Sequence, residues 1–213
     1  MAAPSSARLL KLALPLISEH GFTRVALSRS VLHLPTPHPE PLSDAAVSAL
    51  FGHGNVARKT LFNAWLEGGI ESMQGSTTSA SVKEALHARL AYNEPVLEHL
   101  PEAFALLAAP ESGLPPIDSV PALKHAARVA DQACYISGDP SNRLNWYTKR
   151  AALMGIYSAA ELHQLNSPKT AHSFLDTLLS TSATIDSSVE EVKLFSSYIL
   201  RSWAGIVRSR DIL

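Results

Sequence analysis

Apolar residues recur every three to four positions along most of this chain, which is the spacing of the buried face of an amphipathic helix. The pattern is clear in residues 144–165, where Leu153, Ile156, Tyr157 and Ala160 fall on one face. Stretches rich in proline, glycine and serine separate the helical segments. The predicted helices span residues 7–20, 24–33, 43–51, 55–74, 80–92, 101–109, 119–136, 144–165, 169–180 and 189–209.

The absence of a sustained two-residue alternation bounded by hairpin turns predicts an all-α fold of about ten helices. The first 60 residues have the rhythm of a helix-turn-helix, with a first helix ending near Gly21 and a third capped by Ser43. Prolines between residues 35 and 41 lengthen the turn before that third helix well beyond the usual 3–4 residues. We therefore expect a degenerate helix-turn-helix.

Composition indicates a folded globular chain, with 46% hydrophobic and 17% charged residues and a formal net charge of −1. A nucleic-acid-binding domain is usually clearly basic, and the third helix carries Asp44 but no lysine or arginine. We therefore expect no nucleic-acid partner. The single cysteine, Cys134, lies in an apolar helical run and is predicted to fill the core.

Enzyme chemistry finds little support in the sequence. Glu84 and His87 have the Glu-x-x-His spacing of di-iron helix bundles, but such sites need a second copy, so we interpret them as a surface pair. There is no nucleophile elbow and no phosphate-binding glycine loop. We predict no catalytic residues and no metal site.

Large aromatic and basic side chains crowd the first turn of the helix 144–165. A helix start gains little stability from such residues, whereas aromatics and arginine dominate the energetics of binding surfaces. We predict an exposed partner-docking patch, the alternative being a helix start held to the core through Trp146. The predicted patch consists of Asn145, Trp146, Tyr147, Lys149 and Arg150.

The last predicted helix, 189–209, has a broad apolar arc with arginines at its flank, which is typical of a helix lying in a membrane interface. A terminal helix docked on the core would show the same periodicity. The serine- and threonine-rich stretch 180–188 favours the membrane interpretation because it resembles a tether. The residues predicted to contact the membrane are Leu194, Phe195, Tyr198, Ile199, Leu200, Trp203 and Ile206, with Arg201, Arg208 and Arg210 reaching lipid phosphates.

The run from Asn145 to Arg150, followed by Tyr157 and by Glu161-Leu162, resembles the signature of a family of mitochondrial ubiquinone-biosynthesis accessory proteins, which are TetR-like lipid binders. The resemblance is strongest over 144–165 and fair over the helix-turn-helix region and the tail. Two positions depart from it: Arg143 stands where many relatives carry an acid, and Ala160 stands where threonine is common. Neither position touches the aromatic–basic centre.

This resemblance implies a non-catalytic, TetR-like helical bundle on the matrix side of the mitochondrial inner membrane, peripheral to it and homodimeric. It implies that the protein binds isoprenoid quinone intermediates, needs no cofactor, and presents these lipids to the demethoxyubiquinone hydroxylase. Residues 1–74 would be the degenerate helix-turn-helix region, 75–182 the lipid-binding region and 183–213 the tether and membrane helix. We expect the lipid cavity to be lined by Leu153, Met154, Tyr157, Leu162, Leu178 and Leu179.

Two other functions stay open from the residues alone. A TetR-like transcriptional regulator would bind DNA and a small hydrophobic ligand, and its duplex binding would fall steeply with salt. A helical adaptor without any ligand is the third alternative. An import signal is not established either, because Leu9, Leu12 and Leu16 have the spacing of a packed first helix.

Overall fold

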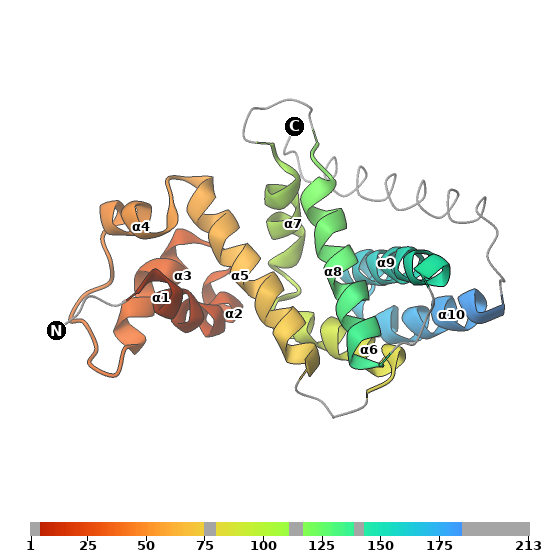
Figure 1. Ribbon diagram of the computed structural model, residues 1–213. Helices are drawn as coiled ribbons and strands as arrows, with labels where there is room; N and C mark the ends of the chain where they lie inside the picture. Colours follow the sequence, from red (N-terminus) through yellow and green to blue (C-terminus); the bar gives the residue numbers. More distant parts are fainter. Residues whose placement is uncertain (1–4, 75–79, 111–116, 139–142, 185–213) are drawn as a thin grey trace. The chain divides into compact units, whose positions relative to one another are not determined.

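The computed structural model describes residues 5–74, 80–110, 117–138 and 143–184. Every regular element in these ranges is a helix (Figure 1), which confirms the all-α prediction for the described part of the chain. The chain divides into two compact units. The first comprises Met1–Gly68 and Pro95–Leu106, and the second comprises Gly69–Glu94 and Leu107–Leu213.

The first unit begins with α1 (Ser6–Ala13), a short 3₁₀ turn and α2 (Ile17–His20). We expected one continuous helix over 7–20, and the structure interrupts it around Pro15. Proline has no backbone N–H and its ring clashes with the preceding turn, so a helix rarely passes through it intact. Gly21 follows α2 with a φ of 64°, a conformation that glycine adopts without strain.

Two short helices, α3 (Arg24–Arg29) and α4 (Asp44–Phe51), occupy the region of the predicted helix-turn-helix. The Ser43 hydroxyl accepts a hydrogen bond from the Ala46 backbone N–H, confirming Ser43 as the N-cap of α4. The Arg24 side chain joins the two helices by donating to the Asp44 carboxylate at 2.7 Å and to the Ser48 hydroxyl at 2.7 Å.

Aromatic residues form the centre of the first unit, where α5 (Asn55–Gln74) and α7 (Leu100–Ala108) contribute to it. The Phe62 ring lies edge-on to Phe22 at 4.9 Å and to Phe104 at 5.1 Å between ring centroids. Edge-to-face pairs at this separation stabilise a core beyond the area that they bury.

The second unit is built from α6 (Val82–Asn93), α8 (Val120–Ile136), α9 (Arg143–Asn166) and α10 (Ala171–Thr184). Helix α9 packs against both α8 and α10, and α6 also packs against these two helices (Figure 1). Their apolar faces enclose one core that includes Leu86, Val129 and Leu175. Cys134 is fully buried there, as predicted.

Candidate functional site

Helix α9 presents two different surfaces along its length. Leu153, Ile156, Tyr157 and Ala160 are buried in the core of the second unit, which confirms the predicted core face. The first turns differ, because the residues from 146 to 149 are exposed. The helix therefore lies on the core over most of its length and presents side chains to solvent near its start.

Trp146 and Tyr147 are large exposed aromatics at this start. Trp146 is 36% exposed and Tyr147 is 72% exposed. Their rings contact each other edge-on, with centroids 4.6 Å apart. Exposure of this kind fits the predicted docking patch better than the alternative in which Trp146 holds the helix start to the core.

Arg150 orders this surface. Its guanidinium lies over the Trp146 ring, with Cζ 3.8 Å from the ring centroid, and its Nε donates to the Asp131 carboxylate on α8 at 2.7 Å. A cation over an indole face and a charge-assisted hydrogen bond both restrict the side chain. A partner would therefore meet a surface that is already arranged, with less side-chain freedom to lose on binding. Sequence reasoning missed Asp131, since its contact with Arg150 exists only once α8 and α9 pack together.

The remaining patch residues are placed less closely. Lys149 is exposed beside Trp146 and Arg150 on α9. Asn145 belongs to the first turn of α9, but its side chain lies outside the described residues. The structure thus brings Trp146, Tyr147 and Arg150 into direct contact and leaves Lys149 alongside them.

A buried polar network lies beneath α9, and sequence reasoning did not predict it. The Glu161 carboxylate accepts hydrogen bonds from the Tyr157 hydroxyl at 2.6 Å and from the Asn93 amide at 3.1 Å. The Arg89 guanidinium on α6 lies 3.8 Å from the same carboxylate oxygen and donates to the Asn93 side-chain oxygen at 2.7 Å. These four residues are at most 3% exposed, so a full charge pair is enclosed in the core.

Charge compensation explains how the core accommodates these groups. Burial by itself would raise the pKa of Glu161, but the His125 ring, the Arg89 guanidinium and the Tyr157 hydroxyl outweigh it and hold that pKa at about 2. Burial lowers the pKa of His125, while Glu161 opposes that shift. His125 Nε2 lies 3.3 Å from the Arg89 guanidinium and 3.8 Å from the Glu161 carboxylate. Arg89 and Glu161 are the buried ion pair of this network.

The residues predicted to line a lipid cavity mostly gather in one place. Leu153 and Tyr157 belong to the core cluster, and Met154, Leu178 and Leu179 pack against it while partly buried. Leu162 is also buried on α9. Tyr157 differs from the others because its hydroxyl is committed to Glu161. Their role in binding a lipid stays a prediction.

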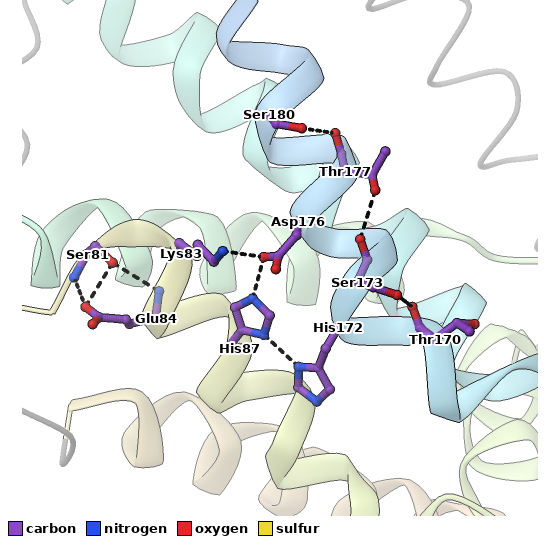
Figure 2. A network of polar contacts seen from close by, with 10 residues as sticks. All are labelled: Ser81, Lys83, Glu84, His87, Thr170, His172, Ser173, Asp176, Thr177 and Ser180. Atoms are coloured by element: carbon purple, nitrogen blue, oxygen red, sulfur yellow. Dashed lines mark hydrogen bonds and ion pairs between the residues drawn. The ribbon is translucent and has the colours of Figure 1, made fainter.

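Other predicted residues lie elsewhere. Glu84 does not act with His87: its carboxylate accepts from the backbone and hydroxyl of Ser81 in a capping box, whereas His87 turns toward α10 (Figure 2). No group of three or more His, Cys, Asp or Glu side chains is placed to hold a metal ion within the described ranges.

The predicted membrane contacts Leu194 to Arg210 lie outside the described residues. No helix in the described part of the chain has the length and hydropathy needed to cross a bilayer.

These features describe an all-helical protein with a buried polar core and an exposed aromatic–basic patch at the start of α9. Comparison with known proteins agrees with this class. Residues 120–195, which include α8, α9 and α10, match the family model COQ9. Over these helices the chain is similar to the COQ9 family.

Individual relatives share the same name. The chain is 28% identical to the rat "Ubiquinone biosynthesis protein COQ9, mitochondrial" over 93% of its own length and 65% of the relative's. It is 31% identical to COQ9-A of Xenopus laevis over 60% of its length and 40% of the relative's. It is 30% identical to coq9 of Schizosaccharomyces pombe over 63% and 53%. The chain therefore spans less than two thirds of the length of these relatives.

Proposed function

We propose that this protein acts in ubiquinone biosynthesis in the mitochondrion. The relatives that it matches are named as mitochondrial ubiquinone biosynthesis proteins, and the family model covers the helices that carry the docking patch. Its role there is to bind isoprenoid quinone intermediates and present them to the demethoxyubiquinone hydroxylase, without catalysing a reaction itself. It acts as a homodimer on the matrix side of the inner membrane.

The observation that carries this proposal is the exposed pair Trp146 and Tyr147 with Arg150 fixed beside it. A protein that presents a substrate needs a surface for the enzyme that receives it, and aromatics flanked by arginine are enriched at the centres of such surfaces. Asp131 holds Arg150 in place, and the Trp146 and Tyr147 rings remain exposed. The patch is thus suited to a protein partner.

Lipid chemistry supports the rest of the proposal. Each buried CH₂ contributes ~0.8 kcal/mol, so a polyprenyl tail of several units does not leave a bilayer unaided. A protein that presents such a lipid needs an apolar surface to receive it and a means of resting on the membrane. The partly buried side chains of Met154, Leu178 and Leu179 are candidates for this apolar surface. Residues 189–209 are the segment that we propose rests on the membrane.

Lipid extraction tests the proposal directly. The full chain is purified from cells that make ubiquinone, extracted with organic solvent and analysed by mass spectrometry, and an isoprenoid quinone or its precursor is the expected product. Leu179→Trp should reduce the lipid recovered per protein, because it adds bulk at a partly buried lining position. Leu50→Trp, on the exposed face of α4 in the first unit, is the matched control and should leave recovery unchanged. Recovery of no isoprenoid lipid from the folded parent would exclude the proposed activity.

A further inference from the structure

Two histidines meet between α6 and α10 in the second unit (Figure 2). His87 Nδ1 and His172 Nδ1 lie 2.6 Å apart. The opposite nitrogen of His87, Nε2, lies 2.7 Å from the Asp176 carboxylate, and the opposite nitrogen of His172 lies 3.2 Å from the Glu94 carboxylate. The four side chains thus form one continuous chain of contacts that begins and ends on a carboxylate.

The ring geometry shows that the central contact is a true hydrogen bond. The two ring planes are inclined by only 7°, and the ring centroids are 4.9 Å apart. For two nitrogens 2.6 Å apart, the distance between the ring centroids is greatest when both Nδ1 atoms lie on the line that joins the centroids. The observed 4.9 Å is close to that greatest distance. The rings of His87 and His172 therefore lie edge to edge in almost one plane, with the two Nδ1 atoms pointing at each other, and not face to face.

This arrangement fixes the number of protons on the pair. Only one proton fits between the two Nδ1 atoms, because one nitrogen must accept what the other donates. Ionised carboxylates accept but do not donate, so each Nε2 must carry a proton to bond Asp176 or Glu94. Three protons on two rings give the pair a single positive charge. A fourth proton would place two N–H groups against each other, and a missing proton would leave either the contact between the rings or one carboxylate contact unmade.

We propose that His87 and His172 form a proton-sharing latch that holds α10 on α6 while the pair carries one charge and loosens when it takes up a second proton. Histidine is the side chain whose ordinary titration falls between pH 5 and 8. Loss of a proton would break either the contact between the rings or one contact with a carboxylate.

The charges around the pair favour one positive charge and oppose two. Asp176 and Glu94 stabilise the first proton, whereas Lys83, whose Nζ lies 2.9 Å from the Asp176 carboxylate, already neutralises part of that attraction. The hydrogen bond from Lys83 and then that from His87 lower the pKa of Asp176, so this acceptor stays ionised through the histidine range. Other ionisable groups on the packed elements make contacts of their own. These groups are Glu84 on α6, His125 and Arg128 on α8, and Glu161 and His163 on α9. Lys169 precedes α10 and is exposed.

Helix α10 is held by an apolar contact with the core, and the latch adds a polar contact with α6. Ala171 and Leu175 bury this helix against the core, and His172 and Asp176 lie on its partly exposed side facing α6. Breaking the latch should therefore loosen α10 locally without unfolding the second unit. Residues 178 and 179, which belong to the proposed lipid-binding side chains, lie on the same helix. The inference does not depend on lipid binding, and each is tested separately.

Histidine ring nitrogens report the latch directly in the full-length parent protein. Long-range ¹H–¹⁵N spectra at pH 7 should show protonated Nε2 atoms on both His87 and His172, and Nδ1 signals intermediate between the protonated and unprotonated positions. Acidification should move both Nδ1 signals to the protonated position. A spectrum at pH 7 in which either Nε2 lacks a proton, or in which both Nδ1 atoms carry one, would overturn the proposal. This measurement needs no variant to fold.

Hydrogen exchange measures the effect on α10. After correction for intrinsic rates, amides of α10 should exchange about fivefold to tenfold faster at pH 5 than at pH 7, as expected for losing one hydrogen bond of ordinary strength. Glutamine cannot be protonated at position 172, so His172→Gln should not show this acceleration. His53→Gln, an exposed histidine of the first unit, is the control and should behave like the parent. Equal acceleration in the parent and in His172→Gln would show that the pair does not control α10.

Discussion

Arg89 and Glu161 face each other 3.8 Å apart with side chains that are 0% and 4% exposed, and they join α6 to α9 through the core. Asn93 bonds both of them, and Tyr157 bonds the carboxylate. An ion pair at this depth is stabilising only when further hydrogen bonds satisfy both charges. The network therefore fixes how α6 and α9 meet.

Removing one partner of this pair should destabilise the protein strongly. Glu161→Gln keeps the shape of the side chain but leaves Arg89 charged and buried without its counter-ion, and we expect a loss of about 3–5 kcal/mol in the free energy of unfolding. Urea denaturation followed by circular dichroism measures it. Glu98→Gln is the control: Glu98 pairs with His99 but is 77% exposed, so its change should stay below about 1 kcal/mol. Similar losses in the two variants would contradict this account.

Stability should fall in two steps as pH decreases. The pKa of His125 is below its ordinary value of 6.5, so the unfolded chain takes up a proton as pH falls through about 6.5 while the folded chain does not. Glu161 has a folded pKa of about 2 against 4.5, so its contribution is complete above pH 4.5 and is lost between 4.5 and about 2.

Urea midpoints measured across this range test both steps. In Glu161→Gln the lower step should shrink, because that variant has no carboxyl to protonate at position 161. The upper step should shrink in His125→Asn. A parent protein whose urea midpoint stays constant from pH 7 to pH 3 would exclude both assignments.

Gly69 should resist replacement because of Arg89. A Cβ atom at position 69 would lie 2.8 Å from both Cζ and Nε of Arg89 and 3.1 Å from the Tyr92 ring. The guanidinium is enclosed and cannot move aside, so Gly69→Ala should lower the free energy of unfolding by about 1–3 kcal/mol. An unobstructed glycine in a helix gives the opposite sign, a gain of roughly 0.5–1 kcal/mol on changing to alanine. A more stable Gly69→Ala variant would therefore show that Arg89 is not held as described.

Local patterns predicted the helices well, because helix boundaries depend on neighbouring residues. Helix α5 spans Asn55–Gln74, as its periodicity predicted, and Ser43 caps α4 through its own backbone. The break around Pro15 was missed, since apolar spacing continues across it while the missing N–H prevents a continuous helix. Exposure of Trp146 and Tyr147 was also predictable, because they lie outside the apolar face of α9.

Contacts between distant residues were not predictable from pattern alone. A charged side chain on a helix is ordinarily a surface residue, so nothing in the local sequence indicates that Arg89 is fully buried. Its partner Glu161 lies three α-helices further along the chain, on α9. The contact between His87 and His172 joins positions 85 residues apart. Such pairs become visible only when the packing of α6, α9 and α10 is known.

The segment beyond residue 187 should bind membranes. Burying four or five of its large apolar side chains at 1.5–3 kcal/mol each gives a gross gain of roughly 6–15 kcal/mol, much of which is offset by immobilising the chain. Association with vesicles containing cardiolipin should be reversible, and should fall for a chain ending at Ser187 and for Phe195→Asp combined with Trp203→Asp. Liposome flotation measures this. If both variants float like the parent, this segment is not the membrane contact.

The docking patch should be needed for partner binding and dispensable for folding. Tyr147 is 72% exposed and the Asp131 partner of Arg150 is 61% exposed, so Tyr147→Ala and Arg150→Glu should change the free energy of unfolding by about 1 kcal/mol or less. Truncating a central aromatic of an interface typically weakens binding by roughly 2 kcal/mol or more, about thirtyfold in affinity. Both variants should therefore lose the demethoxyubiquinone hydroxylase in a pull-down while remaining folded.

Two matched changes separate the patch from general effects. Tyr147→Phe keeps the ring against Trp146 and should retain binding if the aromatic surface carries the energy. Arg29→Glu makes the same charge change on the exposed side of α3 in the first unit and should leave binding intact. Arg150→Glu should be the most disruptive of the four, because it places a carboxylate beside Asp131 and also removes the cation from the Trp146 ring. Undiminished capture of the hydroxylase by folded Tyr147→Ala and Arg150→Glu would exclude this surface as the docking site.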